Sequence, residues 1–490
     1  MTCKTSYVTA TDNPSAAAVP EETGTSGAGH LSVAELPPAQ RTGLIVGLCI
    51  GVLAVAFEMF AITAAMPTIA PQVEGMTVRY AWAFTMFVIG QAFSIIVVGR
   101  LVDRLGAFKP LAAGLVFFGI GLALAGSSSY WFTFLTARVV QGLGGGALTI
   151  AVMVVIAEVF SDTQRSMMVT IFSFCYLLPA FVGPPAAAFI AVNLGWRWVF
   201  WLIIPLLVGA AIVGYRPVHR LYRGRQIRGA SQNDIPIWAA LAGTGGIALL
   251  QGAGQDIAWQ SIGLAVGGLV AVGIAMPRLM PHGFWRIRPG MPALMWVRLT
   301  LAGAFFASQS FMTYLLQEDR KLDAQTASWA LAIGALGWVS GTLLQSRAWL
   351  RLRRDQIMVA GAAFTAFGVG LIAVFAGWHQ VPIWVAGVAL LLAGFGMGLG
   401  ITSTNLALMT LSPPADIGRN TSSLQVSDSL GSAFFGGIAG TIMATLQEHF
   451  HTPLPKTFGW IYAVNGVVAL LALFLALRMG RVRNESSGVG

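Results

Sequence analysis

The chain has 490 residues, of which 56% are hydrophobic and only 10% charged, with a mean hydropathy of +0.73 and a formal net charge of +10. A soluble domain carries about 25% charged residues, so this composition excludes a water-soluble globule and predicts a polytopic membrane protein. The positive charge does not indicate a nucleic-acid partner, because membrane proteins keep surplus Lys and Arg in their cytoplasmic loops. We therefore expect no nucleic acid.

Residues 1–41 differ from the rest of the chain. They are rich in Thr, Ser, Ala, Pro and Gly and lack any apolar periodicity. Such a composition cannot bury enough surface to fold alone, so we expect a disordered cytoplasmic tail. The first apolar run follows at 43–66, and at about 24 residues it is longer than the core of a signal peptide.

Fourteen apolar runs of about 17–25 residues follow one another, each long enough to cross a bilayer as a helix. They lie at 43–66, 80–101, 109–127, 131–157, 166–191, 197–215, 236–253, 260–279, 292–316, 325–345, 357–376, 382–405, 420–446 and 457–477. The Lys and Arg residues between the runs fall mostly on the side of the N-terminus, as the positive-inside rule requires. Removing one middle span would invert every later loop, so charge excludes thirteen spans, and length favours fourteen over twelve.

This count predicts an all-α membrane protein with both termini in the cytoplasm and two six-helix halves, an organisation typical of duplicated transporters. The predicted units are a disordered tail (1–41), an N-terminal six-helix bundle (42–215), a basic connector with two extra transmembrane helices (216–290), a C-terminal six-helix bundle (291–478) and a second cytoplasmic tail (479–490).

The loop after the second span reads GRLVDRLGAFKP and covers residues 99–110. It resembles the signature between helices 2 and 3 of the major facilitator superfamily, with Phe108 replacing a residue that is usually basic. The resemblance implies a latch that gates the rocking of the two halves. The residues that carry it are Gly99, Asp103, Arg104, Gly106 and Lys109. The alternative is a charged loop that only sets topology.

Two further stretches resemble the fourteen-helix drug:proton antiporter branch of that family. FEMFAITAAMP (57–67) is similar to the end of helix 1, with Glu58 where an aspartate is usual. TARVVQGLGGGA (136–147) is similar to the helix 4 motif of proton antiporters, whose arginine and glutamine fall on Arg138 and Gln141. The resemblance implies that these residues take part in proton coupling.

The fifth span carries a partial match to the helix 5 antiporter motif, FVGPPAAAF at 181–189. Its Gly-Pro is present as Gly183 and Pro184, and the resemblance implies a gating role for both. Ala187 and Ala188 replace the usual glycine pair.

The run GLGGG at 142–146 could be mistaken for a dinucleotide-binding loop. It follows no predicted strand and lies inside an apolar span. Small residues that let helices approach closely are the better explanation.

Glu58 raises an energetic question, because a carboxylate near the middle of a membrane helix costs on the order of 2.5–3.5 kcal/mol. It lies eight residues before Met66, about 12 Å from the outer surface. Arg138 lies seven residues after Trp131, about 10 Å from the same surface. The equal depth predicts that the two are partners. Such a carboxylate can exchange a proton or pair with a cation, and the alternative is a purely structural ion pair.

A second acid lies in a polar stripe. Thr421, Gln425, Asp428 and Ser432 follow one another at steps of 4, 3 and 4 on one helix face, which predicts a cavity wall. The alternative is interhelical hydrogen bonding alone. Asn405 and Gln309 are expected to add polar groups opposite.

The remaining charged residues are not expected to form part of a functional site. Arg298 is expected to extend to the inner surface, and residues 318–323 to form a solvated outer loop. No set of residues typical of an enzyme or a metal site appears, so we expect no enzyme and no cofactor beyond the proton gradient.

The sequence therefore predicts a secondary transporter of the cytoplasmic membrane that exports hydrophobic, cationic or amphipathic small molecules in exchange for protons by alternating access. Its expected partners are the lipid bilayer, the substrate and protons, and we expect a monomer. Two alternatives stay open: a dedicated exporter of a lipid or a specific metabolite, and a non-transporting membrane scaffold or sensor.

Overall fold

A computed structural model describes residues 35–77, 79–160, 162–222, 236–253, 259–281, 283–345, 352–412 and 417–480. These residues are almost entirely helical, as expected, and their one β-bridge joins Glu74 to Tyr130. Thirteen of the described helices are long and apolar enough to cross a membrane, and Ile237–Ala253 adds a shorter apolar helix of 17 residues. The expected fourteen runs are all helical.

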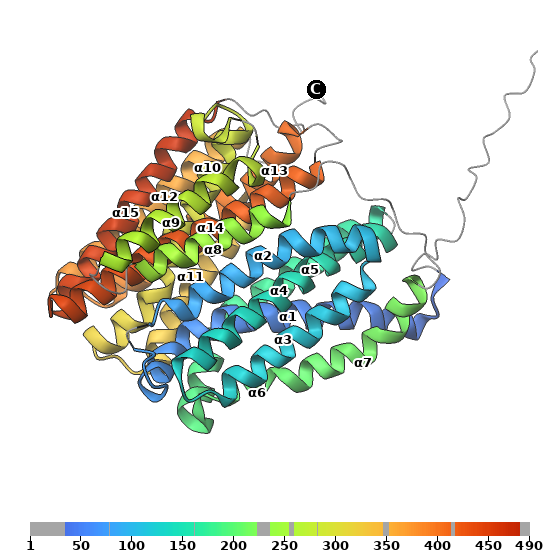
Figure 1. Ribbon diagram of the computed structural model, residues 1–490, viewed down its shortest axis with the longest axis horizontal. Helices are drawn as coiled ribbons and strands as arrows, with labels where there is room; N and C mark the ends of the chain where they lie inside the picture. Colours follow the sequence, from blue (N-terminus) through green and yellow to red (C-terminus); the bar gives the residue numbers. More distant parts are fainter. Residues whose placement is uncertain are drawn as a thin grey trace, which may run out of the picture.

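The helices form two halves and an inserted pair (Figure 1). The N-terminal half contains α1 (Pro38–Ile69), α2 (Trp82–Leu105), α3 (Phe108–Ser127), α4 (Trp131–Val159), α5 (Asp162–Ile190), α6 (Trp198–Trp201) and α7 (Ile203–Tyr222), with η2 (Ala70–Gln72) and η3 (Ala191–Gly195). The inserted pair is α8 (Ile237–Ala253) and α9 (Trp259–Leu279). The C-terminal half contains α10 (Met291–Tyr314), α11 (Ala324–Gln345), α12 (Arg354–Gly377), α13 (Trp384–Leu411), α14 (Ile417–Ala444) and α15 (Leu454–Arg478), with η4 (Phe284–Arg286), η5 (Leu315–Asp319) and η7 (Thr445–His449).

The two ends of the molecule differ. We call the end at which α1 begins and α15 ends the terminal end, and the opposite one the distal end. In Figure 1 the halves converge at the lower left, which is the distal end, and splay apart toward the upper right.

Contacts between the halves gather at the distal end. The ring of Tyr80, which precedes α2, stacks on that of Tyr314 at the end of α10, with centroids 4.7 Å apart. The Thr313 hydroxyl donates a hydrogen bond to the Thr63 carbonyl of α1. Phe181 of α5 packs against Trp329 of α11 with ring centroids 6.2 Å apart. The molecule is therefore closed at the distal end.

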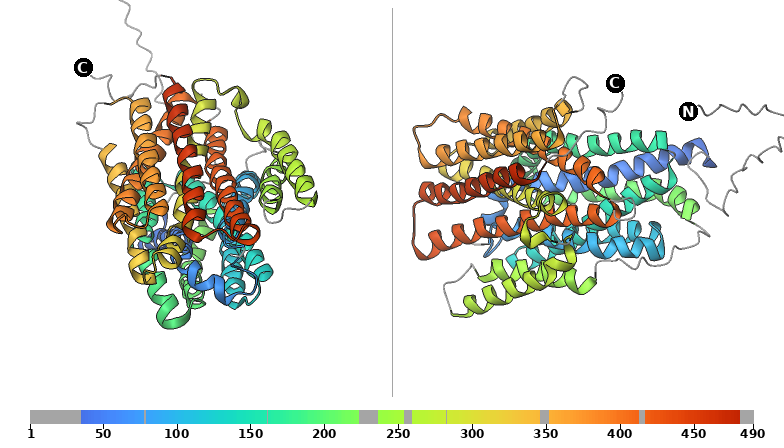
Figure 2. Two further views of the ribbon diagram at one scale, coloured as in Figure 1. Left: turned by 90° about the vertical axis from the view of Figure 1, so that its left-hand side faces the viewer. Right: turned by 90° about the horizontal axis from the view of Figure 1, so that it is seen from above.

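The inserted helices α8 and α9 pair with each other on one side of the molecule (Figure 2). Helix α8 packs against both α2 and α14, so it covers the place where these two helices of different halves meet. The Ser423 hydroxyl of α14 donates a 2.9 Å hydrogen bond to the Leu279 carbonyl at the end of α9.

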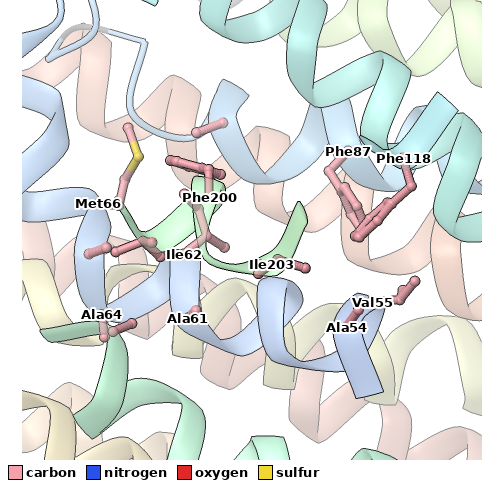
Figure 3. Close-up of a cluster of buried hydrophobic side chains, with 14 of the residues drawn as sticks. Ala54, Val55, Ala61, Ile62, Ala64, Met66, Phe87, Phe118, Phe200 and Ile203 are labelled. Carbon is pink, nitrogen blue, oxygen red and sulfur yellow. The ribbon is translucent and has the colours of Figure 1, made fainter. Parts of the chain in front are cut away.

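Close helix packing explains the glycines of α4. A Cβ added to Gly142 would overlap the Phe87 carbonyl oxygen of α2, and one added to Gly144 would overlap the backbone of Phe118 in α3. The prediction that this run brings helices together is therefore confirmed. Figure 3 shows the result, in which Phe87 and Phe118 lie together near Val55 of α1.

The loop at 318–323 is solvated only in part: the side chains of Glu318, Lys321 and Asp323 are exposed as expected, whereas those of Asp319 and Arg320 are buried. The Arg320 side chain, 7% exposed, donates hydrogen bonds to the carbonyls of Trp378 (2.9 Å) and His379 (2.8 Å) at the end of α12. A cation in this position satisfies carbonyls that the helix leaves without partners. Asp319 is also buried, with its carboxylate 3.5 Å from both Arg320 and His379.

Candidate functional site

Glu58 and Arg138 lie together inside the N-terminal half. The Glu58 Oε1 accepts a hydrogen bond from Arg138 Nη1, and each side chain is only 1% exposed. The other oxygen, Oε2, has no hydrogen-bond partner among the described residues. The contact expected from equal depth is present, and an opposite charge offsets part of the cost of burying Glu58.

Arg138 also connects α4 to its neighbours. Its Nε donates a 2.7 Å hydrogen bond to the Ala83 carbonyl of α2, and its Nη1 lies 2.7 Å from Gln141 Oε1, one turn along α4. The guanidinium carbon lies 4.7 Å from the centre of the Phe87 ring, in a cation–π arrangement. Arg138 thus keeps two further hydrogen-bond partners and the Phe87 ring if Glu58 becomes neutral.

A central cavity of about 80 Å³ lies between the halves and is lined by α1, α2, α4, α10 and α14. Arg138 reaches it from the N-terminal half, and Gln309, Asp428 and Ser432 reach it from the C-terminal half. Aromatic rings make up much of the remaining wall. The Gln309 side chain is 7% exposed and has no hydrogen bond to any residue that the structure describes. The cavity therefore combines apolar walls with a few polar groups, as small-molecule sites do.

Asp428 forms an ion pair with Arg298, a residue expected to extend to the inner surface. Arg298 Nε donates a 2.9 Å hydrogen bond to Asp428 Oδ1, and Arg298 Nη1 donates to Thr404 Oγ1 (2.9 Å) and to the Ile401 carbonyl (3.2 Å). The Arg298 side chain is 4% exposed. The expectation that Arg298 extends to the membrane surface was therefore wrong. The Asp428 carboxylate and the Thr404 hydroxyl supply, inside the protein, the hydrogen-bond partners that lipid headgroups would provide at the surface. The sequence did indicate that Arg298 could lie inside the protein, because it is a lone arginine in an apolar span, as Arg138 is.

The rest of the polar stripe is spread along α14. Ser432 lines the central cavity with Asp428, and its hydroxyl donates a 2.8 Å hydrogen bond to the Asp428 carbonyl. Gln425 is half-buried and Thr421 is exposed, and neither lines the cavity. Asn405 is also exposed and does not line it, so the structure does not place this residue opposite the stripe as expected.

The family model of the Major Facilitator Superfamily matches residues 48–346 and 294–489 of this chain. The chain belongs to that superfamily. Major facilitators are membrane transporters, which agrees with two halves of six membrane spans each around a central cavity, where α6 and α7 together form one span.

Named relatives support the same family. The Multidrug transporter protein MdtP of Bacillus subtilis is 26% identical over 422 residues, which cover 83% of this chain and 76% of MdtP. The Probable multidrug-efflux transporter Rv1634 of Mycobacterium tuberculosis is 23% identical over 433 residues, covering 83% of this chain and 88% of that protein. Among solved structures, the peptide transporter POT in complex with sulfate superposes with a TM-score of 0.67 at 16% identity, over 92% of this chain and 97% of that one. This structural likeness shows the fold alone.

The loop signature of this major facilitator lies at the terminal end, where α2 turns into α3. Gly106 ends α2 at φ 73°, a left-handed conformation that favours glycine, and a Cβ there would lie 3.2 Å from the Tyr222 ring. A Cβ on Gly99 would meet nothing within 4 Å. Arg104 is exposed, and the Asp103 side chain lies outside the described residues. The latch that the resemblance implies stays a prediction.

The Gly-Pro of α5 faces α1. A Cβ added to Gly183 would lie 3.6 Å from Phe60 Cβ and 3.7 Å from Phe57 Cδ2, which is ordinary contact. Pro184 is buried, and α5 contains Pro179 and Pro185 as well. The gating role that the resemblance implies for Gly183 and Pro184 also stays a prediction.

Proposed function

We propose that this major facilitator exports hydrophobic small molecules, cationic or amphipathic, in exchange for protons. Two relatives whose names describe multidrug transport support export of this kind. The central cavity supports it chemically, because aromatic side chains such as Phe84, Phe87 and Phe306 surround a single carboxylate, that of Asp428. Such walls suit an apolar body with a positive charge.

The observation that carries the proposal is the buried pair of Glu58 and Arg138 at the wall of the cavity. Arg138 lines the cavity while Glu58 lies behind Arg138 on α1, with one oxygen bound to Arg138 and the other without a hydrogen-bond partner among the described residues. A proton arriving at this second oxygen would neutralise Glu58 and weaken its hold on Arg138. The arginine charge would then act more strongly in the cavity and repel a cationic substrate.

Alternating access fits the closed distal end and the splayed terminal end. The central cavity, at about 80 Å³, is smaller than the roughly 300–1,000 Å³ of drug-sized sites, so the halves must separate further around a substrate. We place the terminal end in the cytoplasm of a cytoplasmic membrane, because most Lys and Arg residues of the loops lie on that side.

The test measures proton flux in proteoliposomes under an imposed pH gradient after a lipophilic dye cation is added. We compare the wild type with Glu58→Gln. A matched control, Glu158→Gln, removes an exposed carboxylate at the terminal end of α4 that accepts a 2.8 Å hydrogen bond from the Tyr222 hydroxyl. Both substitutions remove one negative charge with little change in shape.

We expect the dye to drive proton flux in the wild type and in the control but not in Glu58→Gln. Coupled flux that persists in Glu58→Gln would show that this carboxylate is only a structural partner of Arg138. If no member of a panel of cations drives flux in the wild type, a dedicated exporter of a lipid or metabolite becomes the better proposal.

A further inference from the structure

A second cavity, of about 170 Å³, lies within the N-terminal half between α1, α3, α4 and α7. It shares no lining residue with the central cavity. Its wall is almost wholly apolar and comes from the parts of these helices nearest the terminal end. Representative wall residues are Leu48, Gly51, Leu111, Leu148, Ala210 and Val218.

The cavity exists because α1 and α7 touch at one point and then separate. A Cβ on Gly47 would lie 3.0 Å from the Gly214 Cα, so the two backbones meet there. One turn further along α1, a Cβ on Gly51 would meet nothing within 4 Å. No side chain of the described residues fills the space that this divergence leaves.

The cavity opens sideways, toward the membrane. Val116 of α3 and Tyr215 of α7 belong to its lining and are 58% and 56% exposed. The two helices run along the outer side of the N-terminal half in Figure 1. In a bilayer their exposed apolar side chains face lipid, so acyl chains have direct access to the opening.

Aromatic side chains line the cavity near the terminal end, and two exposed basic residues are next to them in the sequence. Phe108 of α3 lies against Tyr215 and His219 of α7, with ring centroids 5.7 and 5.4 Å away. Lys109 and Arg216, next to this aromatic cluster in the sequence, are exposed and have no ion pair with a described residue. Aromatic rings and cations at this depth match the headgroup region of a bilayer.

We propose that this cavity binds one acyl chain of an anionic phospholipid, whose phosphate is held by Lys109 and Arg216. The apolar wall suits a hydrocarbon chain, and two exposed cations that have no ion pair with any described residue complement a negatively charged headgroup. The central cavity is lined by both Asp428 and Arg138, and under the proposed function its carboxylate contacts a cation, so the two sites would bind ligands of opposite charge. This lipid site is independent of the proposed export function.

The experiment uses the full chain in nanodiscs that contain phosphatidylglycerol and phosphatidylcholine in equal amounts. Native mass spectrometry after release measures how much of each lipid stays bound. Gly51→Leu places a side chain in the open space of the cavity. Gly209→Leu is the matched control, because a Cβ on Gly209 also meets nothing within 4 Å but this residue does not line the cavity.

We expect the wild type and Gly209→Leu to retain one phosphatidylglycerol in preference to phosphatidylcholine. Excluding a few methylenes in Gly51→Leu should lower this bound fraction roughly tenfold. The pair of substitutions Lys109→Gln and Arg216→Gln should remove the preference between the two lipids. Circular dichroism and size-exclusion profiles matched to the wild type establish that each variant is folded.

Two results would overturn the proposal. Equal retention of phosphatidylglycerol by the wild type and Gly51→Leu would show that the bound lipid lies elsewhere. Equal retention of the two lipids by the wild type would show that Lys109 and Arg216 do not select an anionic headgroup.

Discussion

The two halves of this transporter each place an arginine and a carboxylate inside the membrane, and the two pairs differ in exposure. In the N-terminal half, Glu58 and Arg138 are both 1% exposed. In the C-terminal half, Arg298 is 4% exposed but Asp428 is 25% exposed and lines the central cavity. The Glu58 carboxylate is therefore sealed by protein behind Arg138, which itself lies at the cavity wall, whereas the second pair presents its carboxylate to whatever enters the cavity.

This difference suggests separate roles under the proposed function. A sealed carboxylate, with one oxygen that no described residue hydrogen-bonds, can hold a proton away from water, while an accessible carboxylate can contact a cationic substrate directly. The difference in exposure between the two pairs also has an energetic consequence. A charge left unpaired costs more where water cannot reach it.

The largest effect is expected from Arg138→Met. The substitution leaves Glu58 buried without its cation, which should lower the free energy of unfolding by about 3–5 kcal/mol. Equilibrium unfolding by SDS in mixed micelles measures the change. Adding Glu58→Gln to the same chain should recover part of the loss, and no recovery would mean that Arg138 stabilises the fold mainly through Ala83 and Phe87.

The equivalent change in the other half, Arg298→Met, should have a smaller effect. Asp428 is partly exposed and water can solvate it, so we expect a loss of about 1–2 kcal/mol in the same assay. A loss as large as that of Arg138→Met would contradict the contrast between a sealed and an accessible pair.

Two glycines test whether both pairs depend equally on close helix packing. A Cβ on Gly142 of α4 would overlap the Phe87 carbonyl oxygen, and one on Gly431 of α14 would overlap the Leu299 carbonyl oxygen beside Arg298. Gly142→Ala and Gly431→Ala should each lower the free energy of unfolding by about 1–3 kcal/mol. Gly119→Ala on α3, where a Cβ meets nothing within 4 Å, serves as the control and should be near neutral.

The smallest effect is expected at Asp323, a carboxylate outside the membrane that serves as a reference for Glu58 and Asp428 inside it. Asp323 accepts hydrogen bonds from the Thr326 hydroxyl (2.6 Å) and amide (2.9 Å) at the start of α11. The hydroxyl bond is the main reason that the pKa of Asp323 lies below its usual value. A lowered pKa means that the ionised cap stabilises the fold at neutral pH, and this contribution is lost as the pH falls through the folded value.

Asp323→Ala should therefore lower the melting temperature slightly at pH 7, and the difference from the wild type should vanish well below about pH 4. Melting curves of the two proteins at both pH values measure this. A difference that persists in acid would show that the residue acts through packing rather than through its charge.

Several parts of the site follow from local sequence. The depth of Glu58 and Arg138 can be counted from the ends of their spans, because an α-helix rises by a fixed distance per residue. The glycines of α4 indicate close packing by their size alone. The placement of Asp428 and Ser432 on one face of α14 follows from their spacing of four residues.

Other parts depend on how the helices are rotated and which ones become neighbours. Arg298 gives the same local signal as Arg138, and only the packing of α10 beside α13 and α14 shows that its partners are Asp428 and Thr404. Asn405 is polar and lies in an apolar span, yet it is exposed and does not line the cavity. The burial of Arg320 likewise depends on α12 ending beside it.

The sequence by itself determined that this chain spans a membrane many times, that its helices form two halves around an inserted pair, and where ionisable groups lie along the membrane normal. These properties depend on hydropathy, charge distribution and helical rise, all of which are local. The tertiary structure decided which charge pairs with which, which carboxylate reaches the central cavity, and where α1 and α7 leave a second cavity. These depend on contacts between helices far apart in the chain, and small differences in helix rotation and crossing decide them.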